Sequence, residues 1–390
     1  MPRAGMYSAM ISTAPCVSTK KNWMIPSAGI SASIWLALEF CPAGVNDMKK
    51  IVLTQFRHLE IIEAPVPVPG PGEAVIRTHY AGICGSDLHV YDGLNANAAP
   101  PLIMGHEGAG ELVALNDTRT DVKVGDKVCA HTIKPCCACE ACVTSRENLC
   151  RNVRIMGTNF DGVFTQYMLV DANRLIRFDD TVDDKLAALA EPLTVAVHDL
   201  RRARLQAGDN VLIGGAGPIG LIIGMMAKFS GAANVVLLEI EPIRIRMAQE
   251  MGFAVVDSAL PDCEAACMTY TNGAGFDRAF EITSAQPVFN RCIKLLKKGG
   301  VMVQVGMPPK NTQFELDINK IIFGECDLLG VRHHTMHDMQ TAVKIINSGV
   351  MNEQLTELIS AVYPMEQVAA ALERARTDKT ALRVLMDFAQ

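Results

Sequence analysis

The sequence Gly215-Ala216-Gly217-Pro218-Ile219-Gly220 directly follows the apolar run Val211-Leu212-Ile213 and opens a segment of helical character. A GxGxxG pattern is a weak signal alone, but between a strand and a helix it predicts a dinucleotide-binding turn. Gly215 allows the tight turn, Gly217 lets a pyrophosphate approach the backbone, and Gly220 lets the helix pack on the strand. The helix N-terminus then offers N–H donors to the phosphates, and Pro218 suits its first turn because that position needs no N–H.

Strands and helices alternate along the chain around this turn. Strands are expected at 210–213, 234–238, 276–281 and 301–305, and helices at 218–230, 242–251 and 286–297. Strands that alternate with helices form a parallel sheet covered on both faces, because each helix must carry the chain back across the sheet. We therefore predict an α/β fold with a doubly wound Rossmann domain over residues 198–330.

An acidic residue is expected at the end of the second strand of such a sheet, where it binds the adenosine ribose. Glu239 occupies that position, 24 residues after Gly215. Its carboxylate would repel a 2′-phosphate, so NAD is the expected cofactor rather than NADP. Arg244, five residues further on, either weakens that preference or lines the adenine pocket.

Before residue 185 the sequence has a different pattern of expected secondary structure. Short strand-like runs lie at 51–53, 59–62, 74–78, 110–115 and 127–130, with turns rich in proline and glycine between them. These runs indicate a mostly β, largely antiparallel domain over residues 48–197. After about residue 331 the alternating pattern fades, and a helix at 338–347 is expected to lead the chain back to complete that first domain.

Four cysteines occur at metal-ligand spacing on one short loop, in the order Cys136-x2-Cys139-x2-Cys142-x7-Cys150. Four thiolates without a histidine match a closed, tetrahedral structural zinc site. Such a site has no open position for chemistry, so its expected role is to hold the shape of the loop. Cys137 is out of step with the spacing and is interpreted as a spare thiol.

A catalytic zinc ion needs fewer and mixed ligands, because one position must stay open for water or substrate. Cys84, in Gly82-Ile83-Cys84-Gly85-Ser86-Asp87, supplies a thiolate, and His106, in Gly105-His106-Glu107-Gly108, supplies an imidazole. Each is unconvincing alone, since single cysteines and histidines are usually structural.

Taken together, these motifs resemble those of the zinc-containing medium-chain alcohol dehydrogenases, particularly the branch of sorbitol and threonine dehydrogenases. The resemblance covers residues 48–390, and five motifs occur in the family order: 82–89, 105–107, the four-cysteine loop, Glu191-Pro192-Leu193 and the Gly215 turn. It implies a GroES-like catalytic domain, formed by 48–197 and about 331–390, around the Rossmann domain. It also implies an enzyme in which zinc acts as a Lewis acid while hydride passes from an alcohol to the nicotinamide.

The resemblance also assigns roles to single residues. Cys84, His106 and Glu107 become the catalytic zinc ligands, and Asp87 would orient one of them. Glu191 becomes either a carboxylate that contacts the zinc-bound water or an exchanging fourth ligand, unless it is only an acid at a helix start. Ser86 and His89 are candidates for passing the alcohol proton outward, and Val305-Gly306 resembles the strand end that contacts the nicotinamide amide.

The substrate cues conflict. Glu191-Pro192-Leu193 and Gly85-Ser86-Asp87 favour a secondary alcohol of a polyol, a sugar acid or a related sugar alcohol. His89-Val90-Tyr91 and 306–309 favour a threonine dehydrogenase instead, and a butanediol dehydrogenase is a further alternative. In Arg332-His333-His334, the cation and imidazoles either recognise a carboxylate or phosphate or are solvated loop residues. A non-catalytic NAD(H)-binding redox sensor is the alternative from another class of protein. Such a sensor would be expected to have lost the catalytic zinc motif, yet Cys84, His106, Glu107 and Glu191 are all present.

Composition excludes several other classes. The chain has 390 residues, 49% hydrophobic and 20% charged, with a net charge of −6 and no basic run, so we expect neither nucleic acid nor membrane as a partner. Five of its 13 cysteines lie within 136–150, which favours metal ligation in the cytoplasm over disulfides. Residues 20–43 superficially resemble a signal peptide, but we interpret residues 1–47 as an extension upstream of a start at Met48. The family resemblance implies a homodimer or homotetramer.

Overall fold

The computed structural model describes residues 47–389, so the interpretation of residues 1–46 as an extension lies outside the described residues. Asp47, which we placed in that extension, is instead the first residue of strand β1 (Asp47–Gln55) and pairs with Pro65. The apolar residues of β1, among them Ile51 and Leu53, are fully buried, and this burial fixes the register of the strand.

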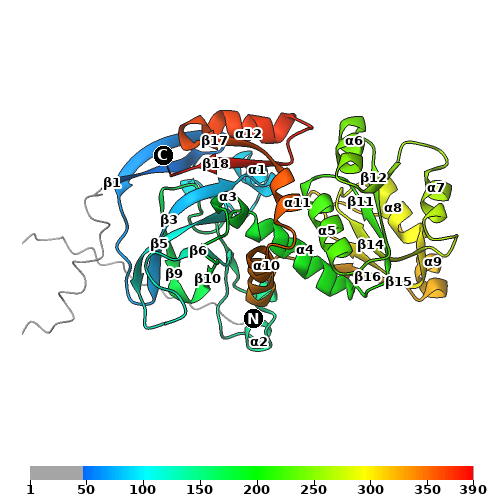
Figure 1. Cartoon of the computed structure of the whole chain (residues 1–390), viewed down its shortest axis with the longest axis horizontal. Helices are drawn as coiled ribbons and strands as arrows, with labels where there is room; N and C mark the ends of the chain where they lie inside the picture. The colour runs from blue at the N-terminus through cyan, green and yellow to red at the C-terminus, as the bar shows by residue number, and fades with distance from the viewer. Residues whose placement is uncertain (1–46, 390) are drawn as a thin grey trace, which may run out of the picture. The chain divides into compact units, whose positions relative to one another are not determined.

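The Gly215 turn lies in a six-stranded parallel sheet with the order β13-β12-β11-β14-β15-β16 (Figure 1). Its strands are β11 (Asn210–Gly214), β12 (Asn234–Glu239), β13 (Ala254–Asp257), β14 (Phe276–Glu281), β15 (Leu296–Gln304) and β16 (Asp327–Gly330). The connecting helices are α5 (Pro218–Phe229), α6 (Pro242–Glu250), α7 (Cys263–Thr269), α8 (Gln286–Lys294) and α9 (Ile318–Gly324). In order of the chain this arrangement is 3-2-1-4-5-6, the Rossmann order, and the predicted fold class is confirmed.

Two boundaries differ from the prediction. The helix expected at 286–297 ends at Lys294, and β15 begins at Leu296 rather than at residue 301. Leu296 is buried and pairs with Phe276, so burial in the sheet overrides the helical spacing of the preceding residues. We did not predict β13, α7 or β16, because each is too short to show a clear period.

Strands from the first half of the chain and from its C-terminal segment form a seven-stranded sheet with the path β10-β6-β5-β3-β18-β17, and β9 also pairs with β3. Its strands are β3 (Glu73–Gly82), β5 (Glu107–Asn116), β6 (Lys127–Ala130), β9 (Tyr167–Asp171), β10 (Leu175–Arg177), β17 (Ile359–Pro364) and β18 (Arg383–Asp387). The last strand, β18, runs antiparallel to β3, with Asp387 opposite Tyr80. The C-terminal segment therefore completes the sheet that the N-terminal segment begins.

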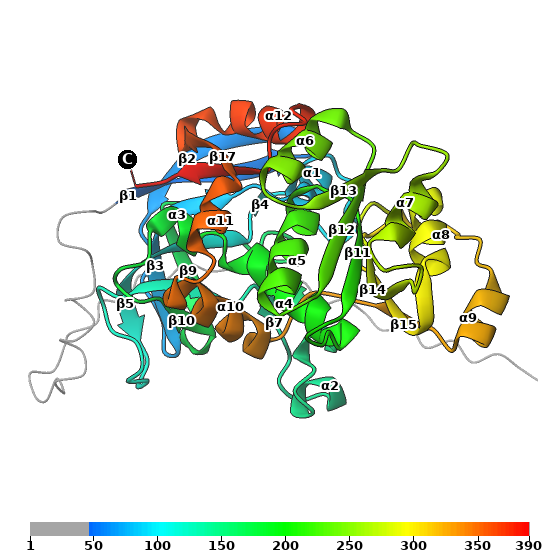
Figure 2. The ribbon, with the colours of Figure 1, turned by 45° about the vertical axis from the view of Figure 1, so that its right-hand side comes forward.

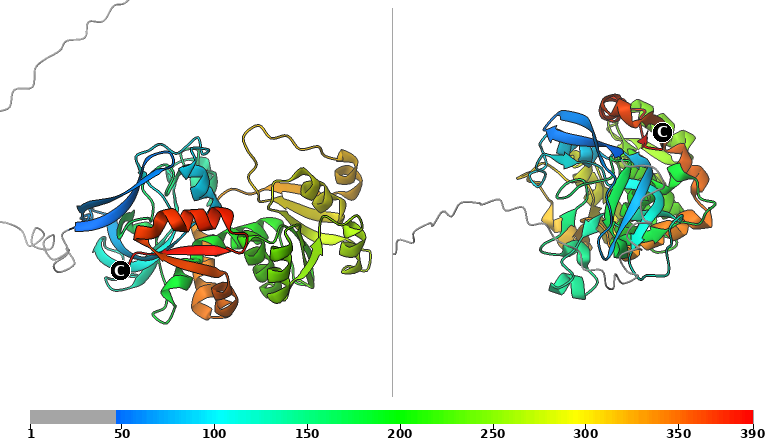
Figure 3. Two further views of the ribbon diagram at one scale, coloured as in Figure 1. Left: turned by 90° about the horizontal axis from the view of Figure 1, so that it is seen from above. Right: turned by 90° about the vertical axis from the view of Figure 1, so that its left-hand side faces the viewer.

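Smaller elements surround this sheet. β1 lies between β2 (His58–Pro65) and β4 (Leu102–Ile103), and β7 (Ile133–Lys134) pairs with β8 (Arg154–Ile155). The short helices are α1 (Gly85–Tyr91), α2 (Glu140–Val143), α3 (Asp184–Ala187) and α11 (Asn352–Glu357). Helix α12 (Val368–Thr377) packs against β18 and is drawn in red in Figures 2 and 3.

Helices α4 (Ala190–Ala203) and α10 (Met336–Ser348) pack on one another, as Figure 1 shows. Their apolar faces share one core with β11 and α5, which includes Leu193, Ile213 and Ala342. Within this interface, Asp338 accepts hydrogen bonds from His198 Nδ1 and from Arg201, each at 2.9 Å. Helix α4 carries Glu191 in its first turn, so this packing fixes the place of that carboxylate. Among the described residues, none of the helices reaches the length and apolarity that a bilayer crossing demands.

Candidate active site and metal centres

The three predicted catalytic ligands lie together. Cys84 follows the end of β3, and His106 and Glu107 stand at the start of β5, where Gly82 is the register partner of Glu107. Pairing of the two strands therefore brings together residues that are more than twenty positions apart in the sequence. One ligand atom from each of Cys84, His106 and Glu107 lies within 4.8 Å of the others. A thiolate, an imidazole and a carboxylate at this spacing fit a catalytic zinc ion with an open fourth position.

Asp87 orients two of these ligands at once. Its Oδ2 accepts the backbone N–H of Cys84 at 2.9 Å, and its Oδ1 lies 3.3 Å from Nδ1 of His106. This contact directs Nε2 of His106 away from Asp87, which is the arrangement that metal-binding histidines usually show. Burial disfavours the imidazolium, but the charge of Asp87 prevails and raises the pKa of His106 well above its ordinary value.

Glu107 has a second partner that we did not predict. Both of its carboxylate oxygens contact Nη1 of Arg383, at 2.7 and 3.0 Å, and both side chains are buried. Burial raises the pKa of Glu107, and the charge of Arg383 opposes that effect. Arg383 comes from the last strand and carries no local motif, so nothing in the neighbouring sequence could have identified it.

Glu191 lies outside the group of three ligands. Its Oε1 is 3.1 Å from Nε2 of His334, and the side chain is about nine-tenths buried. Burial would raise the pKa of this carboxyl, but His334 and His106 outweigh it and lower the pKa to about 2. Because Glu191 is buried, ionised and paired with an imidazole, it differs from an exposed acid whose only role is to begin a helix.

Two interpretations were open for residues 332–334: recognition of an anionic substrate group, or solvated loop residues. In the structure, the residues of this segment differ in their exposure. Arg332 is exposed, as a solvated loop residue would be. His334, in contrast, is 2% exposed and contacts Glu191, so it belongs to the site. Burial lowers the pKa of His333 to about 4, with a further contribution from the charge of Arg332.

The two candidates for proton transfer differ in position. Ser86 places its Oγ 3.5 Å from Nε2 of His106, at the edge of the ligand group. His89 is exposed and lies three residues further along α1, on the same face of the helix as Ser86. The structure therefore brings Ser86 to the site and leaves His89 on the solvent side.

The four predicted cysteines of the loop also lie together. The sulfur atoms of Cys136, Cys139, Cys142 and Cys150 all lie within 4.8 Å of one another. The Sγ–Sγ distances are 3.9 Å between Cys136 and Cys142 and 3.5 Å between Cys139 and Cys142. Four sulfurs bound at about 2.3 Å to one zinc ion are about 3.8 Å apart, so these thiols fit a tetrahedral zinc site. Hydrogen bonds from the backbone N–H groups near Cys142 and Arg151 lower the pKa of Cys139 to about 6, which favours the thiolate that zinc needs. Cys137 is not a member of this group.

The glycine turn between β11 and α5 has the predicted geometry. Gly215 has φ +115°, and a Cβ atom on Gly220 would lie 2.0 Å from the carbonyl oxygen of Gly215. A side chain at Gly220 would therefore force strand and helix apart. At Gly217 a Cβ atom would meet only Nη1 of Arg244, at 3.8 Å, so the space beside this backbone is open to a ligand. Pro218 is the first residue of α5, and Ile219 packs against the core.

The other predicted cofactor residues flank this turn. Glu239 ends β12, and its carboxylate accepts the N–H of Ala216 at 2.9 Å. Val305 and Gly306 follow the end of β15, and both donate their N–H groups to the carbonyl of Glu281. All of these residues lie at the carboxyl ends of strands of the same parallel sheet, which is where nucleotides bind in such sheets.

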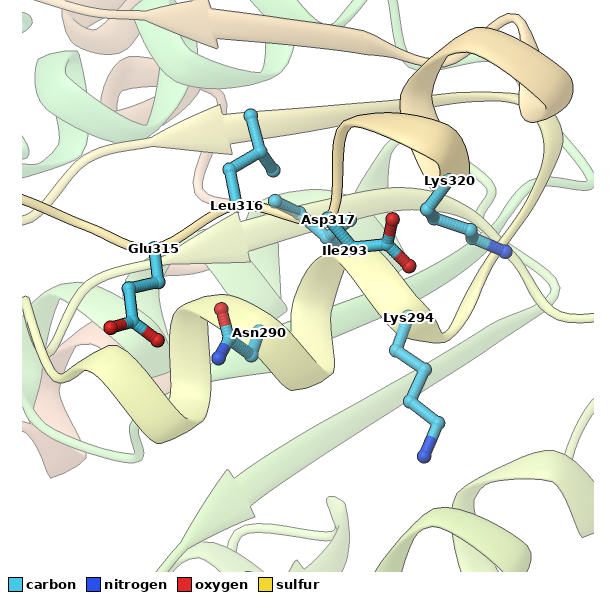
Figure 4. Close-up of a pocket in the computed structure, with 7 residues that line it drawn as sticks. All are labelled: Asn290, Ile293, Lys294, Glu315, Leu316, Asp317 and Lys320. Atoms are coloured by element: carbon cyan, nitrogen blue, oxygen red, sulfur yellow. The ribbon is translucent and has the colours of Figure 1, made fainter.

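Figure 4 shows a pocket elsewhere in the Rossmann domain, between α8 and the segment that leads into α9. It is lined by Asn290, Ile293, Lys294, Glu315, Leu316, Asp317 and Lys320. None of the predicted site residues lines this pocket, so it is separate from the candidate active site.

Comparison with known proteins agrees with this geometry. Residues 70–180 match the alcohol dehydrogenase GroES-like domain family, and residues 218–348 match the zinc-binding dehydrogenase family. The sorbitol dehydrogenase of Bacillus subtilis is 32% identical over 335 residues, which cover 85% of this chain and 94% of that protein. The L-threonine 3-dehydrogenase of Thermococcus kodakarensis is 34% identical over 327 residues, which cover 82% and 92%.

A solved structure agrees over a similar range. The crystal structure of a zinc-binding dehydrogenase from Sinorhizobium meliloti, bound to NADP, superposes with a TM-score of 0.82 at 26% identity and covers 88% of this chain and 100% of that chain. The two family matches, the two relatives and the two groups of side chains that could hold a metal ion converge on one assignment. The chain belongs to the zinc-containing medium-chain alcohol dehydrogenase family, in the branch of the sorbitol and threonine dehydrogenases, and is a zinc- and nicotinamide-dependent enzyme.

Proposed function

We propose that this enzyme oxidises a secondary alcohol of a polyol or sugar acid to a ketone, with NAD as hydride acceptor and Cys84, His106 and Glu107 as ligands of the catalytic zinc ion. The observation that carries this proposal is the grouping of these three ligand atoms within 4.8 Å, at the join of β3 and β5. When bound, zinc supplies the Lewis acidity that lowers the pKa of an alcohol hydroxyl, and NAD accepts the hydride.

The surrounding side chains take supporting roles. Asp87 holds His106 so that Nε2 faces the metal position, and Ser86 beside it takes up the alcohol proton. His89, exposed on the same face of α1, passes that proton to solvent. Glu191, an ionised carboxylate held by His334, would orient water or substrate beside a metal ion bound by the three ligands.

A neutral polyol is favoured over threonine by the charges available for binding, whereas a sugar acid carries a carboxylate as threonine does and is supported by the motifs Glu191-Pro192-Leu193 and Gly85-Ser86-Asp87 alone. An amino-acid substrate needs a cationic partner for its carboxylate, and Arg332, the cation of the 332–334 segment, is exposed. Similarity alone does not separate the two substrates, because the sorbitol dehydrogenase is 32% identical and the L-threonine 3-dehydrogenase 34% identical. Threonine and butanediol remain as competing substrates in the test below.

NAD is proposed over NADP because Glu239 places a carboxylate at the end of β12, beside the glycine turn. Arg244 lies close to Gly217 and donates to the carbonyl of Lys379, so its guanidinium is partly engaged. The carboxylate of Glu239, which would bind the adenosine ribose, therefore decides the preference for NAD over NADP. Val305 and Gly306 are assigned to the nicotinamide amide.

We assign residues 48–197 and 331–390 to the catalytic domain and 198–330 to the NAD-binding domain, with Cys136, Cys139, Cys142 and Cys150 as the structural zinc ligands. The free thiols in the described part of the chain support a reducing compartment such as the cytoplasm. We also infer a homo-oligomer, formed where β16 ends the Rossmann sheet. Exposed apolar side chains gather there on α9 and β16: Ile318, Ile322, Phe323 and Leu328.

The central test replaces Cys84 by serine and uses Cys137→Ser, outside both ligand groups, as the matched control. We expect Cys84→Ser to abolish alcohol-dependent NAD reduction, to leave the Kd for NADH within about twofold, and to lower the zinc content from about two to about one per chain. Metal analysis, NADH titration and turnover are measured on one preparation. Turnover of Cys84→Ser at the wild-type rate would disprove the catalytic assignment.

The substrate is tested by a screen of NAD and NADP reduction with polyols, aldonates, inositols, threonine and butanediol. We expect the highest kcat/KM with a polyol or aldonate and with NAD. Threonine or butanediol as the best substrate would contradict the proposed substrate class. One zinc ion per chain, retained after Cys84→Ser, together with no turnover of any alcohol would favour the non-catalytic, NAD(H)-binding sensor.

A further inference from the structure

The four-cysteine loop makes contacts that its metal does not require. Between Cys142 and Cys150 the chain forms a single 3-10 turn, Glu147–Leu149. Oε1 of Glu147 accepts the backbone N–H of Met336 at 2.7 Å, and Nδ2 of Asn148 donates to the carbonyl of Arg332 at 3.0 Å. These two bonds join the loop to a segment more than 180 residues away, and they bracket residues 333–335.

The bracketed residues include His334, the partner of Glu191. His334 is 2% exposed, and its Nε2 lies 3.1 Å from Glu191 and 3.4 Å from the hydroxyl of Thr132. Its carbonyl oxygen lies 3.3 Å from Nε2 of His131, which is also buried. The imidazole is therefore surrounded, but its direction depends on the backbone that carries it.

That backbone is held in a conformation that it would not adopt alone. His333 has φ +51°, in the left-handed region that residues other than glycine rarely adopt. Such a residue persists only when its surroundings determine its conformation. On one side of His333 the carbonyl of Arg332 is held by Asn148. On the other side the N–H of Met336 is held by Glu147, and Thr335 is held by Asp338.

We propose that Glu147 and Asn148 are positioning residues for the active site: they hold the backbone of residues 332–336 so that His334 keeps Glu191 facing the catalytic ligands. A metal ion held by the four cysteines would then act beyond its own loop. Its ligand Cys150 donates its N–H to the carbonyl of Glu147 at 3.0 Å, so the closed site fixes the turn that reaches across to His334. This inference rests on the proposed role of Glu191.

The test uses isosteric pairs at the two contacts. Glu147→Gln keeps an oxygen that accepts from Met336, whereas Glu147→Ala removes it. Asn148→Asp replaces the donor with a carboxylate that repels the carbonyl of Arg332. Glu140→Ala, an exposed acid on α2 of the same loop, is the control.

The first measurement is amide hydrogen exchange of the peptide that contains Met336. Met336 is the first residue of α10, so its N–H has no acceptor within the helix and depends on Glu147. We expect exchange about tenfold faster in Glu147→Ala and Asn148→Asp, and within about twofold of wild type in Glu147→Gln and Glu140→Ala. Unchanged exchange in both disruptive variants would overturn the proposal, whatever the enzyme acts on.

The second measurement separates kcat from KM and from NADH binding, with zinc content determined for each variant. We expect kcat to fall about tenfold in Glu147→Ala and Asn148→Asp, while the Kd for NADH stays within about twofold and the zinc content stays at about two per chain. If kcat fell only in step with a loss of loop zinc, or equally in Glu147→Gln, the loop would act through folding alone and the proposal would be wrong. A wild-type enzyme that oxidises no alcohol would contradict the proposed function but leave the exchange result intact.

Discussion

Asp199 and Asp338 are buried carboxyl groups on the packed helices α4 and α10, yet their pKa values shift in opposite directions. Asp338 receives hydrogen bonds from His198, Arg201 and Thr335, and these partners outweigh its burial and lower its pKa. At Asp199, burial and then the charge of Asp338 raise the pKa well above its ordinary value, and Oδ2 has no hydrogen-bond partner. One acid therefore stabilises the helix pair at neutral pH, whereas the other weakens it.

We expect Asp199→Asn to raise the thermal midpoint at pH 8 by roughly 2–5 °C. Because the pKa of Asp199 is raised in the folded state, the unfolded chain ionises first as the pH rises, and the stability contribution of this group falls above its ordinary pKa near 3.8. Asparagine does not ionise, so the gain should shrink as the pH approaches 4. Thermal melts of both proteins at pH 8, 6 and 4 measure this difference.

The control for that experiment is Asp338→Asn. It removes the ionised partner of His198 and Arg201, so it should lower the thermal midpoint at pH 8. A gain for Asp199→Asn that did not depend on pH would show that the benefit comes from packing and not from ionisation.

At the residue scale, the sequence predicted the parts of the site that lie in local motifs. Cys84, His106 and Glu107 stand in short patterns, and the thiol loop has its own spacing. Arg383 and the role of His334 were not predictable in this way. Their partners, Glu107 and Glu191, lie 276 and 143 residues away, and contacts of that range are set by sheet order and helix packing.

At the scale of single elements, the join of β11 and α5 allows a sharp comparison of two glycines. A Cβ atom at Gly220 would clash with the backbone of Gly215, whereas at Gly217 it would meet only a flexible arginine end. We expect Gly220→Ala to lower both the thermal midpoint and the affinity for NADH, the former because overpacking costs about 1–3 kcal/mol.

Gly217→Ala should weaken NADH binding by about tenfold or more, with the thermal midpoint nearly unchanged, because the new methyl group occupies the space next to the turn and not the core. Melting curves without cofactor and fluorescence titration with NADH separate the two variants. Equal loss of stability in both would contradict the different roles assigned to these glycines.

Predicted element boundaries were less accurate than predicted element types. The glycine turn and the strands around it followed from local pattern, because strand, turn and helix each have a period or residue that marks them. The early start of β15 at Leu296 did not follow, because residues 286–297 have helical spacing throughout and only the pairing with Phe276 ends the helix. Tertiary pairing decides such positions.

At the scale of the whole molecule, the exposed apolar side chains of α9 and β16 favour a second copy of this chain as the partner. The parallel sheet ends at β16 within the described residues, so the outer backbone groups of that strand are available for pairing across a two-fold axis. Ile322 and Phe323 are 60% and 76% exposed, which is costly for a monomer in water.

We expect Phe323→Glu to shift the sedimentation coefficient towards that of a monomer at micromolar concentration, because a carboxylate would be buried in the interface. Leu94→Glu, at a leucine that is 71% exposed outside α9 and β16, should leave sedimentation unchanged. The same sedimentation for wild type and Phe323→Glu would place the interface elsewhere.

The position of β18 also sets the order in which the protein can assemble during synthesis. Arg383, which pairs with the proposed metal ligand Glu107, leaves the ribosome 276 residues after its partner. At about 5–20 residues per second, translation of that stretch takes roughly 15–55 seconds. Until Arg383 is made, β3 lacks its neighbour β18 and the carboxylate of Glu107 lacks its cation, whereas all six strands of the Rossmann sheet are made within this interval, before β18. The six-stranded parallel sheet can therefore fold on the nascent chain before Arg383 is available to pair with Glu107.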